Sequence, residues 1–528
     1  MPARKSGRPS WEESFEIYAR PRVLALLFLG FSAGLPLLLI FGSLSLWLDE
    51  AGVDISNITY FSWAALAYSF KFVWSPLIDR LPLPLLRSLL GHRRSWLLLT
   101  QAGVITAIVW MALTDPANGL AGMAMAAVML GFSSASQDVV IDALRIESGK
   151  PDEQAAMSAM YVMGYRIGML AAGAGVLFLA FWFGPDLPTG EPEVYDYDSW
   201  KLAYLCMAGL MGIGVATTLL IREPEVNKQR VNVIHAAGDY AIFLLLFLLV
   251  TSSFVLAFVY LNPAPTIRQQ FLDWWHWTGP ASDFVAGALR FLLAVAIAGI
   301  VTMVLYYLPV VPREMVRQTY FEPVADFFRR YAWLGALILL LILVYRISDI
   351  VLGVVSNLFY RNIGFNKQEI GMYSGAYGPI VVIGGGLVGG VLVRHFGILR
   401  ILLLGAVLAA GTNLLFMLLA EAGRDPDILV AVITADNLSA GIATAAFIAY
   451  LSSLTNISFT AVQYAIFSSL MLLLPKVLGG YSGGMVASLG YPNFFLVTTL
   501  LGIPAILLVA WLYYRETRSG ANAVSSDD

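Results

Sequence analysis

The chain has 528 residues, of which 59% are hydrophobic and only 13% are charged. Soluble domains carry about 25% charged residues, so this composition excludes an ordinary soluble enzyme and indicates a chain that lies mostly within a lipid bilayer. The 35 acidic and 32 basic side chains nearly balance, which gives no sign of a nucleic-acid partner, and the single cysteine, Cys206, excludes an internal disulfide.

Long apolar runs, separated by charged and Pro/Gly-rich breaks, predict about fourteen membrane-spanning helices, because a spanning segment must satisfy its backbone hydrogen bonds internally. The predicted spans are 22–48, 58–78, 96–113, 120–144, 155–183, 203–221, 234–261, 284–308, 333–358, 370–393, 398–419, 428–452, 461–487 and 494–513. The fifth and the ninth are long, so we expect a tilt or a kink in each.

Basic residues are distributed unevenly over alternate loops. Most Lys and Arg lie on the side that holds both termini, so the positive-inside rule predicts that both termini are cytoplasmic. We find no pattern of a cleaved signal peptide and expect the first span to be retained. Trp11, Phe15 and Tyr18 recur at helical spacing before that span, which favours a short helix at the membrane surface.

Two loops at corresponding places in the chain carry similar charges. The loop after the second span contains Asp79-Arg80 and then Arg93-Arg94, and the loop after the tenth contains Arg394. This pattern resembles the signature loop of the major facilitator superfamily, in which acidic and basic side chains latch neighbouring helix ends and stabilise one conformational state. The second copy lacks the acidic residue, and a generic positive-inside loop is the alternative interpretation.

The paired loops imply two six-helix bundles, because transporters are commonly built from two related halves. Spans seven and eight are then an insertion between the bundles. We therefore expect an all-α polytopic membrane protein with the major facilitator superfamily fold and two inserted helices. Its predicted parts are a cytoplasmic interfacial segment (1–21), a first bundle (22–225), a linker with the inserted helices (226–318), a second bundle (319–515) and a disordered cytoplasmic tail (516–528).

Charged side chains inside spans are costly, at about 2.5–3.5 kcal/mol each near the bilayer centre, so each needs a reason. Those in the predicted spans are Lys71, Asp138, Asp142, Arg166, Arg346, Asp349, Asp436 and Lys476. They are the first candidates for a transport pathway.

Two of these carboxyl groups lie in the fourth span. Asp138 and Asp142 are four residues apart and therefore share one helical face. Carboxyl groups in a common low-dielectric site can take up and release protons near neutral pH, as a proton-coupled carrier needs. We take these two, with Asp349, as candidates for proton coupling. Alternatively, Asp138 forms a fixed ion pair with Lys71 or Arg166, and Asp142 is a cytoplasmic helix-end group.

Cations at the centre of a span are suited to a carboxylate on the substrate. Arg166 lies midway along the fifth span and can hold a carboxylate bidentately. Arg346 is equally central in the ninth, although Asp349 can neutralise it in a structural pair. Lys71 is a third candidate, unless it snorkels to the membrane surface. Polar side chains suited to sugars complete the set, although single ones often serve helix packing: Tyr68, Gln137, Tyr165, Asn357 and Asn437.

Several motifs in series resemble the AmpG family of muropeptide permeases. In the first half they are ASQDVVIDA at 135–143, GFSAGLP at 30–36, FKFVWSPLIDR at 70–80 and GYRIGML at 164–170. In the second half GIATAAFIAYL at 441–451 agrees with the same family. The likeness covers approximately 22–225 and 320–515, and the two inserted helices depart from the shorter members of the family.

The resemblance implies a proton-driven importer in the inner membrane of Gram-negative bacteria. Its substrates would be N-acetylglucosaminyl-1,6-anhydro-N-acetylmuramic acid and its peptide-bearing forms, which enter from the periplasm for cell-wall recycling and bear on β-lactamase induction. We expect no cofactor beyond the proton gradient, no nucleic acid, and a monomer whose partners are the anhydro-muropeptide, protons and the lipid bilayer.

Two other interpretations stay open at this stage. A carrier of the same fold could move another anionic solute, such as a coenzyme A ester or a siderophore. A membrane-embedded transferase acting on cell-wall precursors is the alternative from a different class, and its chemistry needs a base near the membrane surface. All four histidines lie in loops or at span ends, and only Asp138 with Asp142 resembles a catalytic pair. A primary pump is less favoured than the transferase, because the sequence has no phosphate-binding loop motif G-x-x-x-x-G-K-[ST].

Overall fold

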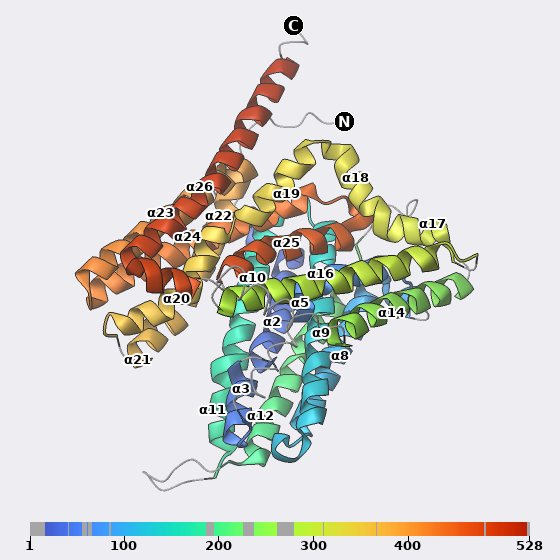
Figure 1. Cartoon of the computed structure of the whole chain (residues 1–528), viewed down its shortest axis with the longest axis horizontal. Coiled ribbons are helices and arrows are strands. Elements are labelled where there is room, and N and C mark those ends of the chain that lie inside the picture. Colours follow the sequence, from blue (N-terminus) through green and yellow to red (C-terminus); the bar gives the residue numbers. More distant parts are fainter. Residues whose placement is uncertain are drawn as a thin grey trace. The chain divides into compact units, whose positions relative to one another are not determined.

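The computed structural model describes residues 16–40, 42–54, 61, 66–83, 86–185, 195–224, 237–260, 279–309, 311–365, 367–479 and 482–524. Within these ranges every regular element is a helix, which agrees with the expected all-α architecture (Figure 1). The chain divides into two compact units. The larger comprises Met1–Val226 with Phe327–Asp528, and the smaller is Asn227–Asp326.

The first half of the larger unit contains the helices that carry the acidic pair and the first arginine. They are α2 (Pro21–Ile40), α3 (Gly42–Glu50), α5 (Leu66–Phe70), η3 (Lys71–Val73), α6 (Ser75–Arg80), α7 (Leu86–Leu90), α8 (His92–Ala112), α9 (Pro116–Ser148), α10 (Gln154–Leu170), η4 (Ala171–Gly175), α11 (Val176–Phe183), α12 (Tyr197–Leu210) and α13 (Gly212–Leu220). Their apolar faces enclose a core around Trp47, Tyr204 and Met207.

The second half of the larger unit is drawn in yellow to red in Figure 1. It consists of the end of α18 (Glu322–Tyr331), α19 (Leu334–Val344), α20 (Ile347–Asn362), α21 (Lys367–Ile370), η7 (Gly371–Tyr377), α22 (Gly378–Phe396), α23 (Ile398–Ala422), α24 (Pro426–Leu454), η8 (Ile457–Phe459), α25 (Thr460–Gly479) and α26 (Ser482–Val524). Its aromatic core is centred on Phe359, Phe416 and Phe495.

The smaller unit holds the predicted insertion. Helices α14 (Ala237–Tyr260) and α16 (Gly279–Tyr306) pack against each other and are followed by α17 (Arg313–Val316) and η6 (Arg317–Phe321). Arg290 of α16 donates a hydrogen bond to the carbonyl of Phe258 on α14 and lies over its ring. The predicted linker 226–318 falls almost wholly within this unit.

Eleven helices of the described residues are long and apolar enough to cross a membrane. They coincide with eleven of the predicted spans. The remaining three predictions, 58–78, 284–308 and 461–487, include residues or side chains that lie outside the described part. The described chain is therefore that of a multi-pass membrane protein.

The fifth and ninth predicted spans are both irregular, as their lengths led us to expect. Helix α10 passes through the π-helical turn η4 into α11. The ninth span breaks between α19 and α20, where Arg346 has φ −104° and ψ 9°. Non-helical backbone at membrane depth is tolerated where it is buried in protein or lines a water-filled cavity. The break therefore marks Arg346 as a position of functional interest.

Glycines bring α2 and α10 into backbone contact. A Cβ atom added to Gly34 would collide with the carbonyl of Tyr165, and one added to Gly164 would collide with that of Leu27. Small residues at such crossings let membrane helices pack closely. This packing holds the segment of α10 that carries Tyr165 and Arg166.

The two halves of the larger unit pack together through α10 against α22 and α24, and through α6 and α9 against α25. Ile146 and Ala155, at the ends of α9 and α10, belong to the same apolar cluster as the core of the second half. Contacts between the halves include those of Asp79, near the end of α6, with the start of α25, and those of the segment 149–155, which leads from α9 into α10. We call this end of the larger unit the closed end.

Candidate functional site

The acidic pair of the fourth span shares one lysine. The Nζ atom of Lys71, in η3, lies 3.9 Å from Oδ2 of Asp138 and 3.8 Å from Oδ2 of Asp142. Tyr161 of α10 donates a hydrogen bond of 2.9 Å to Oδ1 of Asp138. All three charged residues are buried. The 3-10 turn η3 thus brings Lys71 to the two carboxylates. The pairing of Lys71 with Asp138 is the ion pair that the sequence analysis gave as an alternative to proton coupling.

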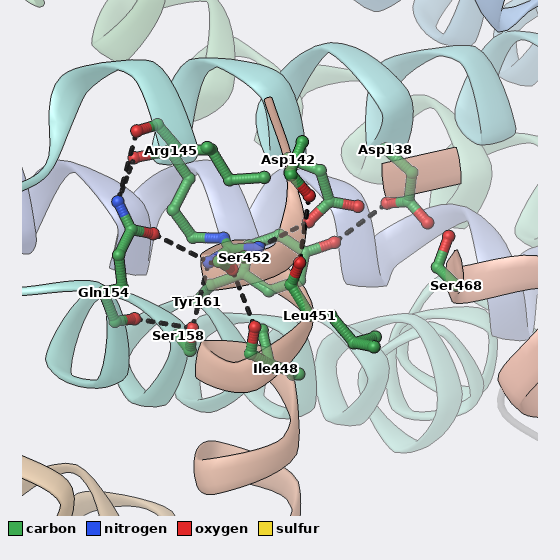
Figure 2. A network of polar contacts seen from close by, with 12 residues as sticks. Asp138, Asp142, Arg145, Gln154, Ser158, Tyr161, Ile448, Leu451, Ser452 and Ser468 are labelled. Carbon is green, nitrogen blue, oxygen red and sulfur yellow. Dashed lines mark hydrogen bonds and ion pairs between the residues drawn. The ribbon is translucent and has the colours of Figure 1, made fainter. Parts of the chain in front are cut away.

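Arg145 links the acidic pair, Asp138 and Asp142, to the second half. It was not among the functional residues predicted from the sequence. Its side chain is fully buried and lies between Asp142, Gln154 and Ser452, as Figure 2 shows. Nη2 is 3.4 Å from Oδ1 of Asp142, and Nη1 donates a 2.8 Å hydrogen bond to Oγ of Ser452 on α24. The guanidinium also lies 5.1 Å from the ring centroid of Tyr464 on α25.

The charges of this cluster balance. Lys71 and Arg145 carry two positive charges, and Asp138 and Asp142 carry two negative ones. In a buried set of this kind, removing one charge is costly, because it leaves a charge of opposite sign without compensation. The network therefore joins the two halves at the closed end without leaving a net charge.

Arg166 and Arg346 are central arginines from opposite halves. Arg346 is paired with Asp349, whose Oδ2 accepts hydrogen bonds of 3.2 Å from Nε and 2.6 Å from Nη2. Arg166 is partly exposed and has no hydrogen bond or ion pair to any residue that the structure describes. The guanidinium groups of Arg166 and Arg346 interact electrostatically, as two like charges. Together with Asp349 they carry one positive charge, that of Arg166, which has no ion-pair partner among the described residues.

The other predicted substrate residues lie in different surroundings. Gln137 is fully buried and donates a hydrogen bond to Ser32, so it packs α9 against α2. Tyr68 donates to Ser134 on α9. Tyr165 is partly exposed and stands beside Tyr161.

Two predicted amide groups belong to the second half. Asn357 is exposed and accepts a hydrogen bond from Ser374, and Asn437 donates to the carbonyl of Ile433 in its own helix. Asn437 also faces Gly378 at the start of α22. The structure therefore brings Arg166, Tyr165 and Arg346 toward one region, and it places Gln137 in the packing of the first half.

The predicted latch residues lie at the closed end. Arg93 forms ion pairs of 2.6 Å with both Asp79 and Glu147. The carboxylate of Asp79 also accepts hydrogen bonds from the backbone N–H groups of Ala461 (3.4 Å) and Val462 (3.2 Å). These groups lie in the first turn of α25, where unpaired N–H groups and the helix dipole favour an anion. Asp79 of the first half therefore caps a helix of the second.

Three further basic residues were predicted to serve this latch. Arg80 lies over the ring of Phe459, 5.6 Å from its centroid, and so also contacts the second half. Arg94 instead donates to the carbonyls of Thr218 and Leu219 within the first half. Arg394 has no ion pair among the described residues.

A cavity of about 700 Å³ lies beside Arg394. Its lining includes Asp152, Arg400 and Glu516, and the Nε and Nη1 atoms of Arg394 are buried without a hydrogen-bond partner. No group of three or more His, Cys, Asp or Glu that could hold a metal ion occurs in the described ranges.

The segment before α2 also contacts the second half. The hydroxyl of Tyr18 donates a 2.7 Å hydrogen bond to the carbonyl of Leu387 on α22. Arg20 and Arg22 both pair with Glu153, between α9 and α10. Burial works to raise the pKa of the Glu153 carboxyl, but the Lys150 N–H and the two arginines outweigh it and hold that pKa below its usual value. The sequence predicted a short surface helix through Trp11, Phe15 and Tyr18. Of these residues the structure describes Tyr18, and Trp11 and Phe15 lie outside the described residues.

Comparisons with known proteins agree with this architecture. The model of the Major Facilitator Superfamily matches residues 337–528, and the model of Acetyl-coenzyme A transporter 1 matches residues 22–120. The solved structure of the human organic anion transporter MFSD10 (TETRAN) aligns with a TM-score of 0.50 at 14% identity, over 95% of this chain and 100% of that chain. The proton:xylose symporter XylE aligns with a TM-score of 0.54 at 11% identity, over 94% of each chain.

Curated relatives match along nearly the whole chain. The anhydromuropeptide permease of Escherichia coli is 30% identical over 504 residues, which is 95% of this chain and 81% of that protein. The putative transporter AmpG 4 of Rickettsia conorii is 28% identical over 497 residues, covering 94% of this chain and 98% of the relative.

The fold and the polar residues between the two halves define a transporter of the major facilitator superfamily, as predicted. Within that superfamily the chain belongs to the AmpG family of anhydromuropeptide permeases. The members are transporters, so the transferase alternative is not supported.

Proposed function

We propose that this protein imports anhydro-muropeptides from the periplasm to the cytoplasm by proton-coupled alternating access. The observation that carries the proposal is the pair of arginines, Arg166 and Arg346, which come from opposite halves and interact electrostatically. Arg346 is paired with Asp349, whereas Arg166 has no ion-pair partner among the described residues. A site between two halves that move relative to each other is where a major facilitator carrier binds its substrate.

The chemistry of the substrate class matches these residues. An anhydro-disaccharide with an acidic peptide stem offers hydroxyls, acetamides and carboxylates. The free guanidinium of Arg166 can hold a stem carboxylate bidentately. The hydroxyl of Tyr165 and the amide of Asn437 are suited to the sugar and acetamide groups.

The contacts between the halves indicate which side is open. The closed end carries Asp79, Arg93, Arg145 and the loops that the charge distribution assigns to the cytoplasm. We propose that the substrate region opens to the periplasm in this conformation. We further propose that the protein lies in the inner membrane with both termini in the cytoplasm.

Import is driven by protons and needs no cofactor besides their gradient. Carboxyl groups within the spans are the groups that can carry a proton, and Asp138, Asp142 and Asp349 were the candidates from sequence. We further propose that a monomer is the transporting unit, since the two bundles of one chain supply the whole site.

A second candidate function is transport of another anionic solute, such as a coenzyme A ester. It is favoured by the match of residues 22–120 to the acetyl-coenzyme A transporter model. The same arginine pair would then bind a phosphate in place of a carboxylate.

The test is uptake into proteoliposomes that contain the purified protein. Labelled anhydro-disaccharide, with and without its peptide, is offered under an imposed pH gradient, with and without an uncoupler. We expect accumulation that the uncoupler abolishes. Accumulation that ignores the gradient would contradict proton coupling, and uptake of a coenzyme A ester alone would favour the second function.

Arg166→Ala tests the arginine pair. Loss of a charge-assisted contact worth about 1.5–3 kcal/mol should weaken binding of the peptide-bearing substrate by roughly 10- to 150-fold. The peptide-free disaccharide should be affected much less. Lys201→Ala, which removes a partly exposed cation of the first half that pairs with Asp198, is the control. Equal loss for both substrates would show that Arg166 serves structure or gating instead.

A further inference from the structure

A carboxyl group without a cation lies on α24. Asp436 receives one hydrogen bond, from the hydroxyl of Thr412 on α23 at 3.4 Å. Within the part of the chain that the structure describes, no lysine or arginine lies within ion-pair distance of it. Its side chain is only partly exposed. An ionised carboxylate in such a place is costly, because the membrane interior does not solvate it.

The other carboxyl groups of the spans differ from Asp436 in this respect. Asp138 and Asp142 share Lys71, and Asp142 also has Arg145. Asp349 is held by Arg346. Each of these groups therefore has a cation beside it. Proton binding at Asp349 would leave Arg346 without its partner, and proton binding at Asp138 or Asp142 would leave their buried cluster with a net positive charge. Asp436 has no such obstacle to proton binding.

The neighbours of Asp436 reinforce this difference. Two groups of α20 interact electrostatically with Asp436. They are the carboxylate of Asp349 and the phenol of Tyr360. From α23 it receives only the hydroxyl of Thr412. On α10, Arg166 has Arg346 and Tyr165 as its electrostatic neighbours.

In the described residues, the remaining elements packed against α24 place no cation beside Asp436. The hydroxyl of Tyr377 on η7 forms a hydrogen bond with the hydroxyl of Thr434, which precedes Asp436 on α24. The basic groups of α22 are Arg394 and His395, at its closed end. The side chain of Lys476 on α25 lies outside the described residues.

We propose that Asp436 is a proton-binding site of this transporter. The inference rests on the proposed function and deepens it by naming the carboxyl that takes up the proton. One proton is added to the Asp436 carboxylate from the periplasmic side and is released to the cytoplasm after the halves reorient. No other bond is made or broken.

The position of Asp436 also connects the proton to the substrate. With Asp436 ionised, Arg346, Asp349 and Asp436 carry a net charge of −1, which opposes an anionic substrate. Protonation brings this group to neutrality and leaves the positive charge of Arg166 available to a stem carboxylate. Proton binding and substrate binding therefore favour each other.

The first experiment compares Asp436→Asn with the unmodified protein in proteoliposomes. An inward gradient of about one pH unit can drive about tenfold accumulation for each coupled proton. We expect Asp436→Asn to reduce accumulation to equilibration while exchange of labelled for unlabelled muropeptide without a gradient persists. Asp427→Asn, an exposed carboxyl in the first turn of the same helix, is the matched control and should accumulate normally.

The second experiment needs no substrate. Infrared difference spectra between acidic and alkaline buffer report the carbonyl stretch of a protonated carboxyl group. We expect a band in the unmodified protein that Asp436→Asn removes and Asp427→Asn keeps. Asp436→Glu should retain a titrating band and part of the accumulation, which guards against failure of the asparagine variant to fold.

The outcomes separate this inference from the proposed function. Retained gradient-driven accumulation in Asp436→Asn, or an unchanged infrared band, overturns the assignment of Asp436. Loss of the band in Asp436→Asn, with no muropeptide uptake by the unmodified protein, supports the proton site and refutes the proposed substrate. Loss of the band together with loss of accumulation supports both.

Discussion

The contacts of Arg145 with the second half lead to a quantitative prediction. Ser452→Ala combined with Tyr464→Leu removes the hydroxyl and the ring that meet the guanidinium across the closed end. Arg145 keeps its first-half partners, Gln154 at 3.1 Å and Asp142 at 3.4 Å. The two deleted contacts exist only while the halves are together, so their loss favours separation of the halves at the closed end.

The size of the effect follows from these two contacts. A hydrogen bond from a charged donor contributes about 1.5 kcal/mol at the lower end of its range, and a cation–π contact adds about 0.5–2 kcal/mol, with the upper value for a desolvated site. The sum is about 2–3.5 kcal/mol. Since about 1.4 kcal/mol corresponds to a factor of ten, the ratio of closed to open molecules at this end should fall roughly 30- to 300-fold.

The assay is a distance measurement between two spin labels. Lys150→Cys and Arg400→Cys put one label on each half near the closed end, in a background with Cys206→Ser. We expect the double variant to gain a population at longer distance. Ser453→Ala is the matched control, because among the described residues that hydroxyl donates its hydrogen bond to the carbonyl of Tyr450 in its own helix and to no residue of the first half. An unchanged distribution in the double variant, or an equal shift in the control, would refute this role of Arg145.

Two further predictions concern stability. Because the folded-state pKa of Glu153 lies below its ordinary value of 4.5, its pairing with Arg20 and Arg22 stabilises the protein above that pH and is lost as the pH falls through the lowered pKa. The melting temperature in detergent should therefore fall on acidification below about pH 4.5 more steeply in the unmodified protein than in Glu153→Gln. Parallel curves of melting temperature against pH would contradict the assignment. Gly164→Ala forces a Cβ atom against the carbonyl of Leu27 and should destabilise the α2–α10 crossing by about 1–3 kcal/mol, measured as a lower melting temperature. Gly209→Ala, where an added Cβ meets nothing within 4 Å, should be neutral or slightly stabilising, and an equal loss in both would argue against the crossing.

Much of the architecture could be predicted from sequence because hydropathy is a local property. A run of apolar residues long enough to cross the bilayer must form a helix whatever its neighbours are, so eleven predicted spans coincide with long apolar helices. The irregular fifth and ninth spans followed from length alone. The charged residues worth examining also followed from sequence, since Asp138, Arg166 and Arg346 are costly in any membrane helix.

The partners of those charges could not be predicted, because they come from distant parts of the chain. Arg145 meets Ser452 across 307 positions, and Tyr18 meets Leu387 across 369. Asp79 was expected to latch neighbouring helix ends, but its capping of α25 depends on how the halves pack. No periodic pattern in the sequence relates residues so far apart.

The sequence by itself determined that the bilayer is the solvent of this protein, which segments cross it, and which side chains are costly there. The tertiary structure alone decided which of those costs are cancelled. Packing brings Lys71 and Arg145 to Asp138 and Asp142, and Arg346 to Asp349. It leaves Arg166 and Asp436 without an ion-pair partner among the described residues. Electrostatic compensation depends on distances in space, and these distances exist only once the helices have packed.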